Sequence, residues 1–196
     1  TMVAVEDLYR PYKPKRRTRA TIAKERGLEP LANVITLQML NTPLEAEAAK
    51  FINPEKEVNT AEDALNGAKD ILAESVSDNA DFRTHIRELT MKHGQLLSAA
   101  KDPEAESVYE MYYEFSESLS KLAGHRILAI SRGEKEKFLI VKIDAPVDRI
   151  LSYLDRKLIT APSAPTAAVL HEVTEDAYNR LIAPAIEREI RNDLFE

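Results

Sequence analysis

Residues 60–76, TAEDALNGAKDILAESV, decide the fold class of this 196-residue chain. Thr60 followed three residues later by Asp63 is the signature of a helix start. Behind it, apolar side chains recur at spacings of three, four and seven, which predicts an amphipathic helix with one buried face. The residues of that face are Ala64, Leu65, Ala68, Ile71, Leu72 and Val76. Small residues, Gly67 among them, line one side, so we expect a second helix to pack closely there as an antiparallel hairpin.

Helical patterning extends over most of the remaining chain. It predicts two short helices separated near Gly27, because Pro30 falls inside the first pattern. Residues 42–45, TPLE, are interpreted as a capping box that opens a short helix to about residue 51. Further helices are expected over about 80–97, 116–135, 146–158 and 174–196, the last capped by Thr174 and kinked at Pro184.

Two segments have a strand pattern instead. Apolar and polar residues alternate over 109–115, and residues 138–143 form a β-branched apolar run. We therefore predict a mainly α fold, a multi-helix array of about nine helices with one small two-stranded β-ribbon. The aromatic side chains of the first segment are expected in the core or in a partner groove, because glutamates between them would repel phosphate. The predicted division is 1–106, a basic arm and helical region, and 107–196, a central region with the ribbon and terminal helices.

Composition excludes several functional classes. The chain has no Cys, which removes disulfides and thiolate chemistry, and only 5 Gly, which disfavours phosphate-cradling loops. No apolar run is long enough to span a membrane and no signal peptide is recognisable, so a cytoplasmic protein is expected. The chain lacks a nucleophile elbow, a P-loop and a glycine fingerprint, so we expect no enzyme and no cofactor.

The charge is distributed unevenly. The net charge is −6, yet residues 10–26 hold eight basic residues and one acid, which leaves −13 on the remainder. Five basic residues follow Pro11 closely, and Pro14 lies among them: Lys13, Lys15, Arg16, Arg17 and Arg19. An extended cationic arm can follow a phosphate backbone without reading its sequence. The alternative, that the arm lies on the acidic body, stays open.

Four segments, in order along the chain, resemble the bacterial Tex proteins, transcription accessory proteins related to a eukaryotic elongation factor. The segments are 8–18 (LYRPYKPKRRT) leading to 28–32 (LEPLA), 64–74 (ALNGAKDILAE), 125–134 (HRILAISRGE), and 180–184 (RLIAP) with 187–191 (EREIR). The resemblance implies a piece of a longer protein, truncated at both ends. Family members carry a RuvC-like domain, helix-hairpin-helix elements and an RNA-binding S1 domain after this region.

The remaining candidate residues each have a functional and a structural interpretation. His125 and Arg132 are seven residues apart and share a helix face, so with Arg126 they could meet phosphate; salt bridges to Glu134 or Glu136 are the alternative. His171 begins a zinc-protease-like pattern that lacks its second histidine, so no metal site is expected. Glu187 and Glu189 are expected on a solvated helix face.

These features predict a nucleic-acid-associated scaffold segment of a Tex-like protein that positions the RuvC-like and S1 domains. Its nucleic-acid partner would be RNA or DNA, bound without sequence specificity. The alternative function is a protein-interaction module that docks a transcription or translation partner through its acidic helices.

Overall fold

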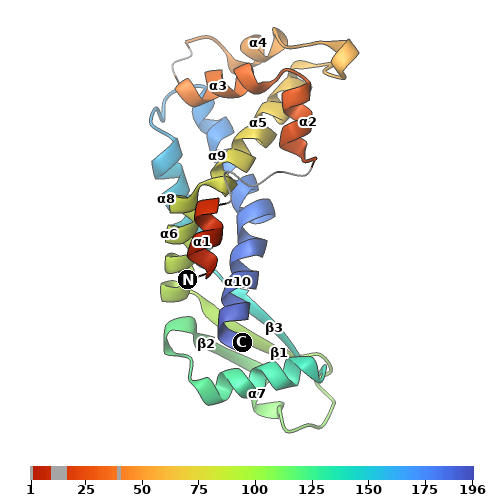
Figure 1. The fold of residues 1–196 in the computed structure, drawn as a ribbon, viewed down its shortest axis with the longest axis vertical. Coiled ribbons are helices and arrows are strands. Elements are labelled where there is room, and N and C mark those ends of the chain that lie inside the picture. Colours follow the sequence, from red (N-terminus) through yellow and green to blue (C-terminus); the bar gives the residue numbers. More distant parts are fainter. Residues whose placement is uncertain (1, 10–16, 39–40) are drawn as a thin grey trace. The chain divides into compact units, whose positions relative to one another are not determined.

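A computed structural model describes residues 2–9, 17–38 and 41–196 (Figure 1). The chain forms two compact units, each made of two stretches: residues 1–83 with 151–184, and residues 84–150 with 185–196. The predicted boundary at 106/107 falls inside the second unit.

The first unit is helical. Its helices are α1 (Met2–Tyr9), α2 (Arg19–Glu25), α3 (Glu29–Leu37), α4 (Leu44–Ala49), α5 (Ala61–Asp78) and α9 (Thr166–Asp176), with a short 3-10 turn at Pro54–Lys56. Three further helices contain residues of both units: α6 (Ala80–His93), α8 (Val147–Leu158) and α10 (Ala183–Phe195). None of the described helices is long and apolar enough to cross a membrane.

Local sequence signals set most helix ends in this unit. Thr60 and Asp63 cap each other's backbone N–H groups at the start of α5, as predicted. The break between α2 and α3 is confirmed at Gly27, whose φ of 79° is a left-handed conformation that glycine adopts without strain. The capping box predicted at 42–45 is wrong, because Pro43 occupies the cap position of α4 and no side chain caps that helix.

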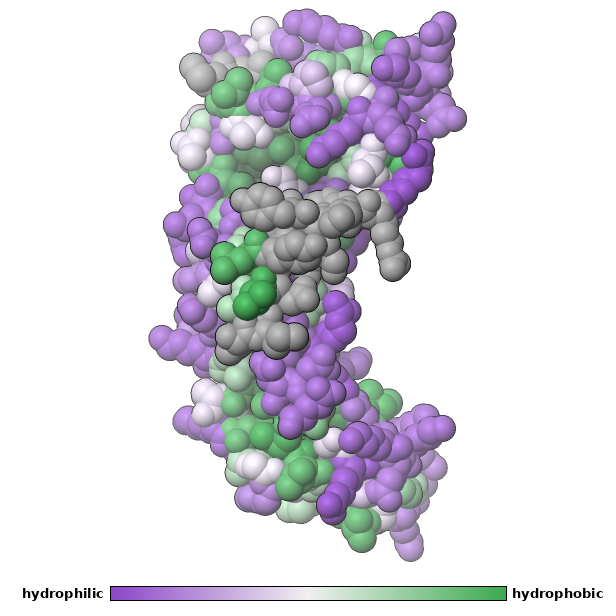
Figure 2. Space-filling model, in the orientation of Figure 1, coloured by the Kyte–Doolittle hydropathy of each residue, from purple (hydrophilic) through white to green (hydrophobic). Residues whose placement is uncertain are grey.

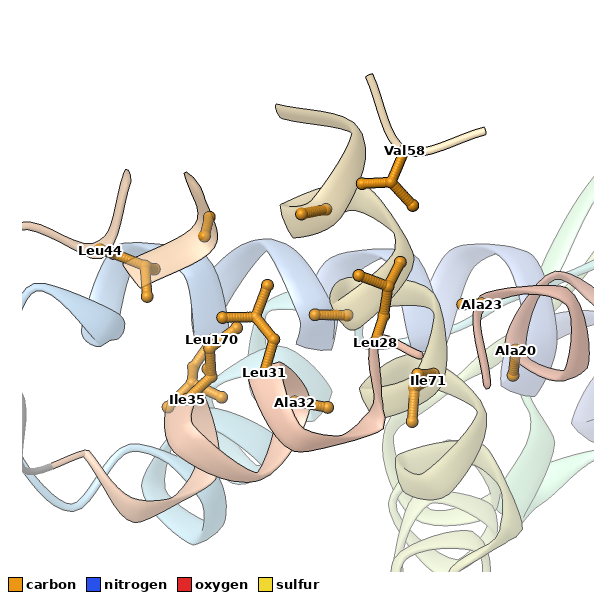
Figure 3. Close-up of a cluster of buried hydrophobic side chains, with 13 residues drawn as sticks. Ala20, Ala23, Leu28, Leu31, Ala32, Ile35, Leu44, Val58, Ile71 and Leu170 are labelled. Atoms are coloured by element: carbon orange, nitrogen blue, oxygen red, sulfur yellow. The ribbon is translucent and has the colours of Figure 1, made fainter. Parts of the chain in front are cut away.

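The hydrophobic core of the first unit gathers around α5. Figure 3 shows Leu31 and Ile35 close to Leu170, and Leu28 beside α5. The small side of α5 packs against α2 and the turn after it: a Cβ placed on Gly67 would lie 3.3 Å from the Ala23 Cβ. The sequence predicted an antiparallel hairpin of α5 with the helix that follows it. That prediction is wrong, because α2 packs against the small side of α5 instead.

The predicted start of the last helix at Thr174 is wrong. Helix α9 already begins at Thr166, and a π-helical segment, Ala177–Ile182, joins it to α10 without a break. Pro184 lies just after that segment. Because proline has no N–H to donate, a wider turn before it accommodates the missing hydrogen bond. The sequence predicted a kink at Pro184, and the structure places a π segment directly before this proline.

The second unit contains an antiparallel sheet of three strands, in the order β2-β1-β3: β1 (Gln95–Ala100), β2 (Glu114–Ser118) and β3 (Leu139–Asp144). The prediction of a two-stranded ribbon is wrong, because Leu96 and Leu97 belong to the central strand and not to a helix. The run at 138–143 is confirmed as β3. The alternating segment 109–115 is mostly a 3-10 turn, Glu110–Tyr112, that leads into β2.

Helix α7 (Gly124–Lys135) packs on this sheet, and it begins eight residues later than the pattern from 116 predicts. It approaches β3 closely at Gly133, where a Cβ would clash with Leu139. On the other side of β3, α10 closes the strand edge: Arg191 donates to the Val141 carbonyl at 2.8 Å, and Glu187 accepts from the Ile143 N–H at 3.3 Å. Tyr109 and Tyr112 are buried, in agreement with their expected place in the core.

Candidate nucleic-acid interface

The basic arm is described only in part. Lys13, Lys15 and Arg16 lie outside the described residues. The Arg17 guanidinium pairs with the Glu25 carboxylate at 2.8 Å, and both side chains are largely exposed. An exposed ion pair of this kind contributes little free energy, so it leaves Arg17 able to exchange its partner for a phosphate.

Arg19 faces the acidic body of the first unit. It opens α2 and exerts its charge on Asp70 of α5 and on Asp176 at the end of α9. Arg180 joins the same cluster, with two hydrogen bonds to Asp176 and a contact of 3.9 Å to Asp70. Those hydrogen bonds lower the pKa of Asp176, whereas burial raises the pKa of Asp70 despite the nearby guanidinium groups. This cluster gives Arg180 a structural role, whereas Arg19 is exposed and forms no ion pair among the described residues.

Arg126 is engaged within the second unit. Its guanidinium lies over the Phe115 ring, 5.3 Å from the centroid, and 3.8 Å from the Glu117 carboxylate of β2. A phosphate would have to compete with the ring face and the carboxylate for this guanidinium. The structure therefore separates Arg126 from the other predicted cations.

Helix α7 presents a cationic face to solvent, made of His125, Leu128, Arg132 and Lys135. Leu128, Arg132 and Lys135 lie three, seven and ten residues after His125, so the four side chains lie along one stripe of the helix. All are exposed, and Leu128 at the centre is 63% exposed. In the lower part of Figure 2, where Figure 1 places α7, hydrophobic surface lies among hydrophilic surface.

The salt bridges expected for Arg132 do not form among the described residues. Glu134 instead binds the Arg191 guanidinium with both oxygens, and Glu136 accepts a hydrogen bond from the Tyr109 hydroxyl. Arg132 and Lys135 thus have no ion pair in the part of the chain that the structure describes. Lys135 was not among the predicted site residues, although its spacing of ten from His125 was a sufficient signal.

His171 lies in a cluster that the sequence pattern did not reveal. Its Nδ1 is 2.7 Å from an Asp155 oxygen of α8, and its Nε2 is 2.8 Å from Glu175. The hydrogen bond with Asp155 is the main reason that the pKa of His171 is raised, and Thr174 donates to the same carboxylate at 2.7 Å. Among the described residues no group of carboxylates and histidines is arranged to hold a metal ion. Asp155 is 16 residues from His171, too far for a local motif to indicate the contact.

The expectation that Glu187 and Glu189 lie on a solvated helix face is wrong. Glu187 binds the edge of β3, and Glu189 pairs with Arg87 at 2.9 Å in a contact where both side chains are mostly buried. The two carboxylates therefore point to different partners.

Comparisons with known proteins confirm the resemblance to the Tex proteins. The family model described as Tex central region-like matches residues 41–196. The chain is 51% identical over 195 residues to the uncharacterized protein YdcI of Bacillus subtilis, covering 98% of this chain and 27% of the relative. It is 38% identical over 212 residues to Protein tex of Bordetella pertussis, covering 100% of this chain and 26% of that protein.

A more distant relative is the human S1 RNA-binding domain-containing protein 1, which is 29% identical over 211 residues, 99% of this chain and 21% of that protein. The chain thus spans about a quarter of the length of the curated relatives that it matches. The family model matches residues 41–196, and Protein tex is 38% identical over 100% of this chain. The chain therefore belongs to the Tex family.

Proposed function

We propose that this chain is a nucleic-acid-associated segment of a Tex-family protein and that it contacts phosphates through the cationic face of α7. Its helices would position the RuvC-like and S1 domains that the family carries elsewhere. The proposal includes no catalytic role, in line with relatives that are named transcription accessory proteins.

The observation that carries the proposal is the exposure of Arg132 and Lys135. Cations without an acidic partner among the described residues keep their charge available, and His125 extends the stripe by two turns. The whole chain carries a net charge of −6, so a local basic stripe would orient an approaching polyanion. Leu128, exposed between the cations, offers an apolar contact to a base or sugar.

The arm supplies a second proposed contact. Arg17 is held only by an exposed pair with Glu25, and Lys13, Lys15 and Arg16 precede it in the sequence. Arg126 is left out of the proposed interface, because its guanidinium already contacts the Phe115 ring and the Glu117 carboxylate. Arg19 is exposed at the start of α2, close in sequence to Arg17, and is counted with the arm.

A salt titration tests the proposal. Binding of labelled single-stranded RNA and of duplex DNA is measured from low to physiological salt for the chain and for the double variant Arg132→Gln/Lys135→Gln. Each lost phosphate contact lowers the slope of log K against log salt by about 0.9 for duplex DNA and about 0.7 for a single strand. The double variant is therefore expected to lower the slope by about 1.8 and about 1.4.

The matched control is Arg188→Gln/Lys142→Gln, which removes two exposed cations of the second unit outside α7. A second variant lacks residues 1–16 and keeps Thr18, because Thr18 caps α2 and donates a hydrogen bond to Glu74. Equal slopes for the α7 variant and the control would refute the proposed interface, and no salt-dependent binding by the chain would refute nucleic-acid association.

A second candidate function is a protein-interaction module, favoured by a groove in the first unit. The groove has a volume of about 730 Å³, and α2, α3, α5 and the start of α6 line it with one cation, Lys24, and four carboxylates, Glu29, Glu74, Asp78 and Asp81. Such a surface would repel nucleic acid and accept a cationic protein segment. This function predicts an absence of salt-dependent nucleic-acid binding in the titration above.

A further inference from the structure

The two outer edges of the sheet in the second unit differ in how they are closed. Side chains of α10 occupy the outer edge of β3, where Arg191 and Glu187 bind backbone groups of Val141 and Ile143. The outer edge of β2 has no such cover among the described residues.

The register shows which groups of β2 point outward. The Ala100 N–H donates to the Tyr113 carbonyl, and the Leu119 N–H donates to the Gly94 carbonyl, so the odd-numbered positions of β2 bond to β1. In an antiparallel pair the bonding direction alternates, so the N–H and C=O groups of Glu114, Ser116 and Ser118 point away from β1. An outer edge of this kind is a template for another strand.

The segment that leads from β1 into β2 is strongly acidic. Residues 102–114 contain five carboxylates and no Lys or Arg: Asp102, Glu104, Glu106, Glu110 and Glu114. Two apolar side chains of the segment are exposed, Val108 at 86% and Met111 at 67%. Exposed apolar residues surrounded by charge of one sign are typical of an interaction surface.

Tyrosines hold the segment in one conformation. The Tyr113 hydroxyl donates to the Ala105 carbonyl at 2.8 Å and contacts the Ser107 hydroxyl at 2.8 Å. Tyr109 is buried against Phe138, and Tyr112 packs edge-to-face on Phe115. A surface that is ordered before binding avoids much of the entropy cost of association.

A pocket of about 560 Å³ lies where the acidic segment meets β1 and β2. It is lined by Ala99, Ala100, Pro103, Glu110, Met111, Tyr113 and Glu114. The lining of the pocket therefore combines small apolar side chains with two carboxylates, and one of these carboxylates, that of Glu114, belongs to the first residue of β2.

We infer that an extended cationic segment of a protein partner adds a strand to the β2 edge and places an apolar side chain in this pocket. Its backbone pairs with Ser116 and its neighbours, while its Lys or Arg side chains face Glu110 and Glu114. In this mode of recognition backbone hydrogen bonds supply affinity and the pocket selects the side chain. The carboxylates exclude nucleic acid as the occupant, because they repel phosphate.

The probe is a fluorescein-labelled peptide of seven residues in which lysine alternates with valine and leucine. Its binding to the full chain is measured by fluorescence anisotropy, and amide NMR shifts of the labelled chain locate the contact. The expected result is binding with shifts at Glu114, Ser116 and Ser118. The same peptide with glutamate in place of lysine is expected not to bind.

Two pairs of variants separate edge pairing from charge attraction. Ser116→Pro removes one outward N–H without breaking a bond to β1, and it is expected to abolish binding, whereas Ser116→Ala keeps the N–H and the affinity. Glu110→Lys/Glu114→Lys is expected to weaken binding about tenfold or more, because like charges then face each other. The control Glu55→Lys/Glu62→Lys alters exposed acids of the first unit and is expected to have no effect.

Circular dichroism establishes that each variant is folded. Failure of the lysine peptide to bind would overturn the inference, and so would equal binding by Ser116→Pro and Ser116→Ala. Amide shifts at Glu114, Ser116 and Ser118 on addition of a single-stranded oligonucleotide in the absence of the peptide would overturn it as well, because the site would then accept phosphate.

Discussion

Replacement of Gly133 by alanine tests how closely α7 packs on the sheet. A Cβ at this position would lie 2.4 Å from Leu139 Cδ1, 2.8 Å from Leu139 Cγ and 3.1 Å from Tyr109 Cδ1. Carbon atoms in van der Waals contact are about 3.5–4.0 Å apart, so Leu139 has to move by about 1 Å. Leu139 and Tyr109 are both buried, which leaves them little room to do so.

The expected magnitude is the difference of two opposing effects. Alanine is favoured over glycine inside a helix by about 1 kcal/mol. Overpacking of a filled core costs about 1–3 kcal/mol, and three close contacts from two buried residues place this site in the upper part of that range. We therefore expect Gly133→Ala to lower the free energy of unfolding of the second unit by about 1–2 kcal/mol.

Gly124→Ala is the matched control, because it makes the same substitution at the start of the same helix with no atom within 4 Å of the new Cβ. It is expected to raise stability by up to about 1 kcal/mol. Native-state amide hydrogen exchange of β1 and β3 measures both effects in the second unit directly, which avoids assuming that the two units unfold together. A stabilisation by Gly133→Ala equal to that of Gly124→Ala would refute the close packing of α7 on β3.

Two further predictions concern the first unit. Because its carboxylate partners raise the pKa of His171, their stabilising effect is complete below the unfolded pKa of about 6.5 and is lost as pH rises through the higher folded pKa. His171→Gln is thus expected to lower stability by about 0.5–1 kcal/mol at pH 5.5 and to have no effect at high pH, measured by urea unfolding; a constant difference would contradict this. Gln38 is buried with a φ of 55°, donates to the Leu158 carbonyl at 2.8 Å and accepts from the Thr160 and Ala161 N–H groups. Gln38→Ala is expected to cost about 2–3 kcal/mol in thermal unfolding, and Gln38→Gly, which removes the backbone strain, is expected to recover only part of it; full recovery would show that the hydrogen bonds contribute nothing.

The helices of the first unit were predictable because their signals are local. The Thr60–Asp63 cap and the apolar stripe of α5 act within one helix. Gly27 separates α2 from α3 through its left-handed φ, and Pro30 lies in the first turn of α3, where a proline is tolerated. The start of α9 at Thr166 was not predicted, because the local pattern at Thr174 was interpreted as a helix cap. Thr174 has the sequence context of a cap, yet its hydroxyl binds Asp155 of α8, a contact that depends on the packing of two helices.

The candidate interface was predictable only in part. The spacing of His125 and Arg132 correctly indicated a shared face of α7. Which cations remain free of acidic partners depends on residues distant in the chain: Arg191 takes Glu134, which leaves Arg132 without it, and Phe115 and Glu117 contact Arg126. A count of charges along the sequence cannot distinguish these cations from Arg132.

The sequence by itself determined the family, the mainly helical class and the division of charge between a basic arm and an acidic body. These properties follow from residue order and short-range periodicity. Only the tertiary structure decided that residues 95–100 are the central strand of a three-stranded sheet. Leu96 and Leu97 fit a helix as well as a strand, and their state is set by hydrogen bonds to β2 and β3, which lie about 20 and 45 residues further along the chain. The same long-range pairing closes one edge of the sheet with α10 and leaves the other edge, at β2, open among the described residues.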